Sequence, residues 1–200
     1  QTTLERPGFL SKDGLTAAEM GTALHAFLEH ADFGALAAVR DAEDAAVLDA
    51  VRAERERQAA AQLTLPAIAG KLDVYKILRF VRSEAFRRIC GAEDVLRELA
   101  FITSLPAAEV MAAQGRALPD GPAADAEVLV QGIADIVLIY PDHLELLDYK
   151  TDRRKTPADF VRAYRAQLEL YAKAIDKRFA PRRVTYKGIY SLELGELIQV

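Results

Sequence analysis

Two aspartates interrupt apolar runs in the segment GIADIVLIYPDHLELLDYK, residues 132–150. Asp135 lies in the first run, Asp148 lies in the second, and Lys150 follows two residues later. Core strands normally exclude such side chains, because burying a charge without a partner is costly. The placement of these three residues therefore indicates that their charges have a purpose.

The polar residues 140–143 join the two runs and predict the turn of an antiparallel hairpin. If Ile139 pairs with Leu144, the same register places Asp135 opposite Asp148. Opposed side chains have Cβ atoms about 5 Å apart, so the two carboxylates repel unless a cation neutralises them. A slip of one residue in the register would remove this arrangement.

Lys150 shares a strand face with Asp148, because side chains alternate along a strand. Two carboxylates suit a hard divalent ion such as Mg²⁺ or Mn²⁺, which polarises phosphoryl oxygens and supplies hydroxide. The amine can orient or deprotonate water and offset charge on a pentavalent transition state. The pattern predicts phosphodiester hydrolysis, with an ordinary buried salt bridge between Lys150 and either aspartate as the alternative.

Glu98 and His25 are two further candidates for this site. Glu98 interrupts a predicted strand and could supply a third carboxylate, although a surface ion pair with Arg97 or Arg88 also explains it. His25 lies on an amphipathic helix, where a lone histidine is more often a core or boundary residue than a ligand. These residues alone leave both roles open.

Gln167 and Tyr171 are four residues apart on a predicted helix and therefore share a face. Glutamine can hydrogen-bond a phosphate or a base edge, and tyrosine can stack on an unpaired base. Tyr164 and Arg165 lie close by. Packing of Tyr171 in the core, beside its apolar neighbours, is an equally good interpretation.

Hydrophobic periodicity and breaker residues predict a helical first half and a second half with strands. The expected helices cover residues 17–31, 42–62 and 71–90, with Pro66 and Gly70 as breakers between the last two. The second half is expected to contain strands at 96–105, 127–139, 144–151, 183–191 and 196–200, a loop at 107–125, and a helix from 157 to about 179.

This order of elements predicts an α/β (α+β) fold with a central mixed β-sheet flanked by helices. We expect a single domain over 1–200, with a mainly helical part at 1–94 that carries His25, and a sheet core at 95–200 that carries the two aspartates and Lys150. The length of 200 residues is sufficient to bury a substantial core.

Composition excludes several classes of protein. No apolar run is long enough to cross a bilayer and no signal peptide is recognisable, so we expect a cytoplasmic protein without a membrane partner. A single cysteine, Cys90, excludes an iron-sulfur cluster held by this chain alone. Residues 149–187 contain twelve Lys or Arg and four Asp or Glu in a chain of net charge -4, which favours contact with a polyanion.

Several segments of the chain together resemble the RecB-type nuclease domain of the PD-(D/E)XK superfamily. Those segments are, in order, residues 6–10, 21–25, 97–101, 131–135, 148–151 and 167–171. More narrowly, the chain is similar to the C-terminal nuclease domain of the AddA subunits of bacterial helicase-nucleases. The resemblance implies a restriction-endonuclease-like core and a metal-dependent deoxyribonuclease with exonuclease or endonuclease action.

The resemblance also implies a role for each matching residue. It implies that His25, Asp135, Asp148 and the main-chain carbonyl of Tyr149 bind Mg²⁺, for which Mn²⁺ can substitute, and that Lys150 is the catalytic lysine. Glu98 matches an acidic position of the active site. The remaining matches and nearby cations imply DNA contacts by Gln167, Tyr171, Arg153, Arg154 and Arg165.

The same resemblance implies a set of partners. The substrate is DNA, chiefly single-stranded, and the setting is repair of double-strand breaks by recombination. We expect an AddB-type partner subunit, with helicase domains upstream in a longer chain, since these 200 residues contain no phosphate-binding loop of the G-x-x-x-x-G-K-[ST] type. A catalytically inactive module that binds DNA or a partner subunit is the alternative function.

Overall fold

The computed structural model describes residues 17–64, 66–117 and 126–200, and the chain divides into two compact units. We call Gln1–Val81 the helical unit and Arg82–Val200 the sheet unit, and each is described by itself. The expected motif at 6–10 lies outside the described residues. None of the described helices is long and apolar enough to cross a membrane.

The helical unit is built around α3, which is anchored to the end of α1. Gln58 donates to the carbonyl of Phe27 at 3.0 Å, and Glu54 accepts from the backbone N–H of Asp32 at 3.2 Å. These buried hydrogen bonds satisfy polar groups between helices that are otherwise joined by apolar packing. The helices are α1 (Ala17–His30), α2 (Phe33–Val39), α3 (Asp44–Ala60), α4 (Pro66–Ala69) and α5 (Val74–Arg82).

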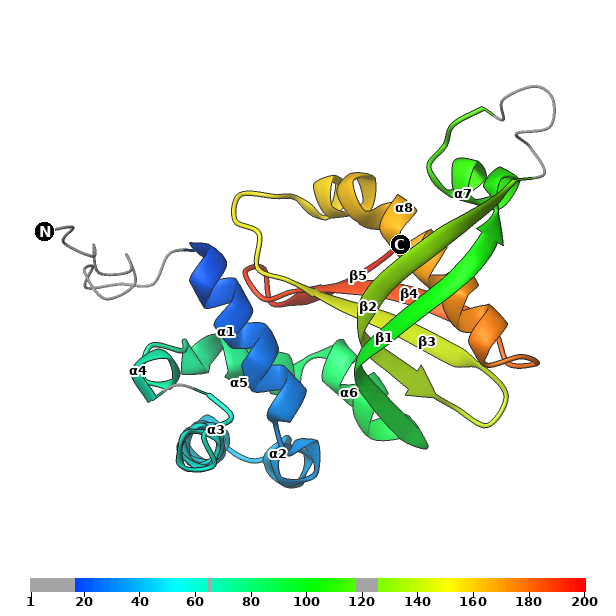
Figure 1. Cartoon of the computed structure of the whole chain (residues 1–200). Coiled ribbons are helices and arrows are strands. Elements are labelled where there is room, and N and C mark those ends of the chain that lie inside the picture. Colours follow the sequence, from blue (N-terminus) through cyan, green and yellow to red (C-terminus); the bar gives the residue numbers. More distant parts are fainter. Residues whose placement is uncertain (1–16, 65, 118–125) are drawn as a thin grey trace, which may run out of the picture. The chain divides into compact units, whose positions relative to one another are not determined.

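The sheet unit contains one mixed sheet in the order β1-β2-β3-β4-β5 among the described residues (Figure 1). Of the strand pairs in the described part of the chain, only β3 and β4 are parallel, and α8 forms the crossover between them. The elements are α6 (Glu84–Gly91), β1 (Asp94–Pro106), α7 (Ala107–Ala113), β2 (Glu127–Ile139), β3 (Leu144–Lys150), α8 (Pro157–Arg178), β4 (Val184–Ser191) and β5 (Glu196–Gln199). The fold-class prediction of a mixed sheet flanked by helices is confirmed.

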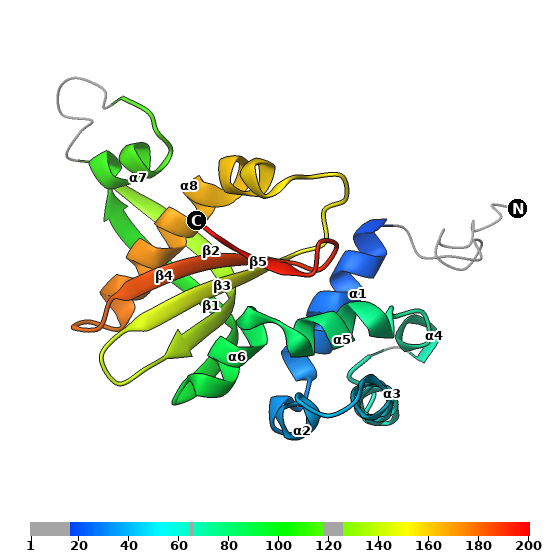
Figure 2. The ribbon, with the colours of Figure 1, turned by 180° about the vertical axis from the view of Figure 1, so that it is seen from behind.

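The strand β3 lies in the centre of the sheet, and its first six residues are buried. Leu144 and Leu146 belong to the core that α8 covers with Phe160, Leu168 and Ile175. Asp148 and Lys150 continue the same alternation, so their side chains face α8 as well. Figure 2 shows the sheet from behind, with β4 and β5 on the side of β3 away from β1.

Three expectations about the helices need correction. The region 71–90 is not one helix, because Ser83 interrupts it and caps α6 by accepting from the N–H of Phe86 at 3.2 Å. Part of the expected loop at 107–125 is the helix α7, whereas 118–125 lies outside the described residues. The helices α2 and α4 were not expected, although Asp32 caps α2 and Pro66 begins α4, as such residues often do.

Candidate active site

The β2–β3 hairpin has the predicted register. Ile139 pairs with Leu144, and the pairing continues to Ile136 with Leu147, one pair before the two aspartates. There the main-chain ladder stops, and the N–H of Tyr149 donates to Asp135 Oδ2 at 2.7 Å. The carboxylate of Asp135 therefore holds β3 where a backbone carbonyl would otherwise do so.

The β1–β2 ladder is interrupted at the same level. Its register is continuous from Asp94 to Pro106 except at Glu98, whose opposite position is Asp135. Glu98 has a φ of 47°, in the left-handed region that non-glycine residues seldom adopt. Such strain costs on the order of 1 to 3 kcal/mol and is concentrated at functional sites.

The alternation of β2 changes at this interruption. Before the interruption, Gly132 lies against the core side chain Phe101, and Ala134 belongs to the core that α8 covers. After the interruption, Val137 belongs to the same core. Strict alternation would place residues 134 and 137 on opposite faces. Asp135 thus lies at an irregular point of the strand, and one of its carboxylate oxygens is within 4.8 Å of one of Glu98.

Glu98, Asp135 and Asp148 occupy corresponding positions on β1, β2 and β3, and we call these three residues the carboxylate row. Burial raises the pKa of Asp148 to about 6, and the neighbouring Asp135 carboxylate acts in the same direction. Lys150 opposes this rise with its ammonium Nζ at 2.5 Å from Asp148 Oδ2. The repulsion expected between the two aspartates is therefore present.

The alternative of a buried salt bridge is realised in part, since Lys150 and Asp148 form an ion pair whose side chains are 18% and 4% exposed. Burial acts to lower the pKa of Lys150, but Asp148 and Asp135 outweigh it and the pKa is raised. The pair nevertheless differs from a simple anchor, because two carboxylates, Asp148 and Asp135, act on one amine, and a carboxylate oxygen of Glu98 lies within 4.8 Å of one of Asp135. Oxygen donors in this number fit a hard divalent cation.

The other expected ligands remain predictions. His25 is a partly buried residue of α1 in the helical unit, whereas the carboxylate row lies in the sheet unit. Tyr149 is buried at 3% exposure, and its N–H is engaged by Asp135. Arg88, one of the two arginines considered as a partner for Glu98, pairs with Glu84 and Glu145, whereas an ion pair of Glu98 with Arg97 stays a prediction.

Gln167 and Tyr171 lie one turn apart on α8, as expected, and both are partly buried. The Tyr171 ring packs edge-on against Phe101, with centroids 4.9 Å apart. A Cβ at Gly132 would lie 2.8 Å from atoms of both rings, which explains the glycine. Tyr171 is therefore anchored in the core, and its contact with DNA remains a prediction.

The three expected DNA-binding arginines are exposed but are not grouped together. Arg153 and Arg154 lie between β3 and α8, and Arg154 has a φ of 61°. Arg165 lines a groove of about 480 Å³ between α7 and α8, together with Arg162 and Lys173. Their contacts with DNA therefore stay predictions.

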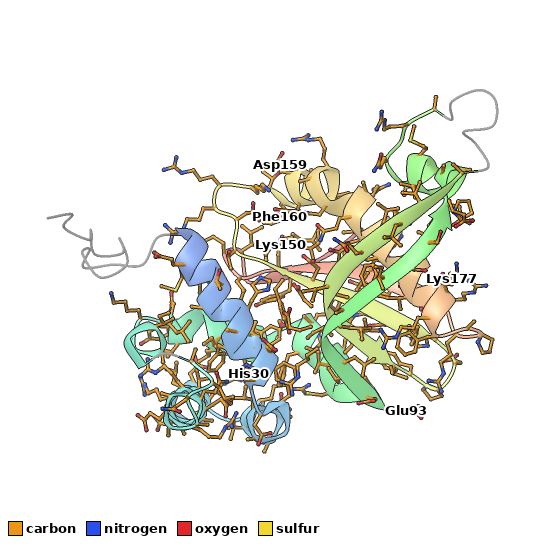
Figure 3. All side chains as sticks on the ribbon, in the orientation of Figure 1. His30, Glu93, Lys150, Asp159, Phe160 and Lys177 are labelled. Carbon is orange, nitrogen blue, oxygen red and sulfur yellow. The ribbon has the colours of Figure 1, made fainter. Side chains whose placement is uncertain are left out.

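Sequence reasoning did not identify a cluster beside Lys150. Asp152 accepts from the hydroxyl of Tyr164 at 2.8 Å and pairs with Lys155 at 2.7 Å. The Tyr164 ring centroid lies 4.7 Å from Lys150 Nζ. In the sequence, only the opposite charges of Asp152 and Lys155, three residues apart, could have indicated this cluster. Figure 3 labels Lys150 together with Asp159 and Phe160, from the first turns of α8.

Comparison with known proteins agrees with this geometry. A family model described as the PD-(D/E)XK nuclease superfamily matches residues 3–196. Three similar relatives are each named as the A subunit of an ATP-dependent helicase/nuclease. They come from Moorella thermoacetica (37% identical, 97% of this chain and 13% of the relative), Pelotomaculum thermopropionicum (35%, 96% and 14%) and Bacillus velezensis (32%, 96% and 15%). The chain thus spans about one seventh of the length of these relatives.

Proposed function

Because the chain belongs to the PD-(D/E)XK nuclease superfamily, we propose that it hydrolyses phosphodiester bonds in DNA, chiefly single-stranded DNA, with Mg²⁺ as cofactor. The observation that carries this proposal is the carboxylate row beside Lys150, at a point where both neighbouring ladders are interrupted. The backbone strain at Glu98 and the burial of Asp148 beside a second acid both cost stability, and a functional role for these residues explains why they are present.

The proposed metal ligands are Asp135, Asp148, the carbonyl of Tyr149 and His25, with Glu98 completing the acidic site. When bound, Mg²⁺ supplies Lewis acidity at the scissile phosphoryl group, and Mn²⁺ can substitute for it. Asp148 is mostly ionised at neutral pH despite its pKa of about 6, so it can bind a cation there. A cation also relieves the repulsion between Asp148 and Asp135.

Lys150 is proposed to act as an ammonium group. Its raised pKa means that it is protonated at neutral pH, which disfavours a role as general base. A positive charge held 2.5 Å from Asp148 can offset the negative charge that develops on the phosphoryl oxygens in the transition state. The sequence alone left two roles open for Lys150, deprotonation of water and stabilisation of charge, and the structure favours the second.

DNA as substrate is supported by the charge of the segment that follows the site. Residues 149–187 have a balance of +8, which contrasts with the net charge of -4 for the whole chain. Arg153, Arg154 and Arg165 are exposed and are proposed to bind phosphates, with Gln167 and Tyr171 orienting an unpaired strand. A single strand suits this surface because its bases are available for stacking.

The wider role follows from the relatives, whose name describes one subunit of an ATP-dependent helicase/nuclease. We propose that the chain is the nuclease part of a longer helicase-nuclease that works with an AddB-type subunit in repair of double-strand breaks by recombination. The small share of each relative that the chain matches, about one seventh, supports a larger polypeptide of this kind.

The test is cleavage of end-labelled single-stranded DNA by the chain with Mg²⁺ and with EDTA. We expect cleavage with Mg²⁺ only, faster than for a duplex of the same sequence, and its loss in Asp148→Asn. Asp142→Asn is the matched control, because it removes an exposed carboxylate from the same hairpin. Equal cleavage in EDTA, or equal cleavage by Asp148→Asn, contradicts the mechanism. Binding of DNA without cleavage, in Mg²⁺ and in Mn²⁺ alike, supports an inactive binding module.

A further inference from the structure

The ring of Tyr164 lies beside the ammonium group of Lys150. Their separation, 4.7 Å from Nζ to the ring centroid, is within the range of a cation–π contact. Tyr164 projects from the second turn of α8, so it reaches Lys150 from outside the sheet. Lys150 is therefore held between Asp148 on its own strand and an aromatic ring on the helix.

Tyr164 is itself held from two directions. Its hydroxyl donates to Asp152 Oδ2 at 2.8 Å and accepts from Lys155 Nζ at 3.2 Å. Its ring stacks on the buried Phe160, with centroids 6.2 Å apart and planes inclined by 30°. Because these contacts occupy both the hydroxyl and one side of the ring, the position of the ring is defined before any substrate binds.

The start of α8 is fixed as well, which determines where Tyr164 lies along the helix axis. Thr156 and Asp159 form a reciprocal capping box, and Pro157 occupies the first turn. The capping box fixes the residue at which α8 begins, and Phe160, one turn before Tyr164, is fully buried. The ring of Tyr164 therefore extends from a helix that is anchored to the core in its first turns.

Lys150 needs a second partner if Asp148 binds a metal ion. A lysine side chain is a point charge on a flexible stem, so its position depends on its contacts. A cation at Asp148 shares the carboxylate that otherwise attracts Lys150 at 2.5 Å. The aromatic ring is not a ligand for Mg²⁺, and its attraction for the ammonium group is therefore retained when the metal binds.

We propose that Tyr164 is a positioning residue that keeps the Lys150 ammonium directed at the reacting phosphate when the carboxylate row is occupied by metal. The proposal rests on the proposed function, in which Lys150 acts on the transition state. The ring, which also has Lys155 Nζ at 4.6 Å from its centroid, is the part that acts on Lys150, because the hydroxyl donates to Asp152. Phenylalanine should therefore substitute well for Tyr164, and leucine should not.

The kinetic test compares Tyr164→Leu, Tyr164→Phe and a matched control, Tyr186→Leu. The centroid of the Tyr186 ring also lies 3.9 Å from a cation, the Arg88 guanidinium. Tyr186 pairs with Glu145, so it lies on the face of the sheet opposite Lys150. We expect kcat to fall about 10- to 100-fold in Tyr164→Leu, because a displaced catalytic group costs about this much. KM for single-stranded DNA and the affinity for Mn²⁺ should stay within about 3-fold in every variant, as should kcat in Tyr164→Phe and Tyr186→Leu.

The proposal is overturned if Tyr164→Leu keeps its kcat, if Tyr164→Phe loses as much as Tyr164→Leu, or if only KM or Mn²⁺ affinity changes. A second measurement does not depend on activity. In NMR spectra, the ε-protons of Lys150 should show an upfield ring-current shift that persists on adding Mg²⁺ and disappears in Tyr164→Leu. Loss of that shift in the wild-type chain with Mg²⁺ overturns the positioning role, whereas a chain that shows the shift but does not cleave DNA contradicts the proposed function instead.

Discussion

The strand β3 carries a buried acid near each end, and each acid pairs with a cation that lies over a tyrosine ring. At the first end, Glu145 pairs with Arg88 at 2.7 Å, and Arg88 lies 3.9 Å from the Tyr186 ring centroid. At the other end, Asp148 pairs with Lys150 at 2.5 Å, and Lys150 lies 4.7 Å from the ring of Tyr164. The two pairs are built from equivalent parts.

The two ends differ in the charges around the pair. Arg88 is shared with Glu84, but Glu84 also pairs with Arg87, so two arginines match two glutamates at the first end, and an arginine remains charged at any working pH. Asp148 instead faces a second carboxylate, Asp135, at a break in the ladder. A buried pair with balanced charge anchors the sheet, whereas a pair with surplus acid creates a site for a cation.

The largest expected difference between the two ends is in catalysis. Lys150→Ala should lower kcat by about 10³-fold, because it removes the charge that offsets the transition state. Glu145→Gln, which removes a buried acid from the same strand, should change kcat by less than about 3-fold. Rates of single-strand cleavage with saturating Mg²⁺ measure both. Similar losses in the two variants would mean that both pairs act only through the stability of β3.

For the free energy of unfolding, we expect a large effect at the Arg88–Glu145 pair, and Arg88→Met tests it. It leaves Glu145 buried at 6% exposure without its guanidinium, which should lower the free energy of unfolding by about 3 to 4 kcal/mol. Urea denaturation measures this loss, and the double variant Arg88→Met/Glu145→Gln should recover most of it. A change in Arg88→Met below about 0.5 kcal/mol would contradict the anchoring role.

The pH dependence of stability should separate the two ends next. The pKa of Asp148 is raised from 3.8 to about 6, so the folded state binds more protons than the unfolded state between these values. The free energy of unfolding of the metal-free chain should therefore fall as pH rises from about 4 to about 6, by on the order of 2 to 3 kcal/mol from this group. Subtracting the profile of Asp148→Asn isolates the effect, and a difference that rises over this interval contradicts it.

The smallest expected effect is a gain in stability without metal. Asp135→Asn keeps an oxygen that can accept from the N–H of Tyr149, but it removes the charge that repels Asp148. The unfolding free energy in EDTA should rise by about 1 kcal/mol, and excess Mg²⁺ should remove the advantage, because only the wild-type chain gains from binding. Thermal denaturation in the two conditions tests this, and a loss of stability in EDTA would favour the simple salt-bridge interpretation.

The sequence was most informative where local pattern and pairing agree. The hairpin register followed from the turn at 140–143 and the apolar runs around it, and β2 has the expected bounds. The long helix α8 has Pro157 in its first turn and Pro181 shortly after its last residue, and both signals are present in the sequence. These signals are local, so they are readable without knowledge of the rest of the fold.

The geometry of the carboxylate row was less accessible to sequence reasoning. Simple alternation implied that Asp135 opposes Asp148 within a regular ladder, but the ladder stops one pair earlier and Asp135 accepts from a backbone N–H. The left-handed conformation of Glu98 has no signal in its neighbours, since glutamate is not expected at a positive φ. Such strain is maintained by tertiary packing, which a single sequence does not reveal.

The tyrosine beside Lys150 shows a further limit. Its contact with Lys150 depends on the height of α8 over β3, which is set by the capping box at Thr156 and by the packing of Phe160. The split between α5 and α6, in contrast, depends on a local contact, the cap that Ser83 provides to α6, which the apolar periodicity of the region obscured. The contact of Tyr164 with Lys150 depends on packing between α8 and β3, and the pattern within either element does not predict it.

We expect the carboxylate row, and not the pair at the other end of β3, to bind a divalent metal ion. Crystals of the chain soaked in Mn²⁺ would show the position of the ion in an anomalous difference map. The expected result is a peak in contact with both Asp135 and Asp148, and no peak at Glu145. A map without density at the row, or with its strongest peak beside Glu145, would rule out the metal site proposed for the row.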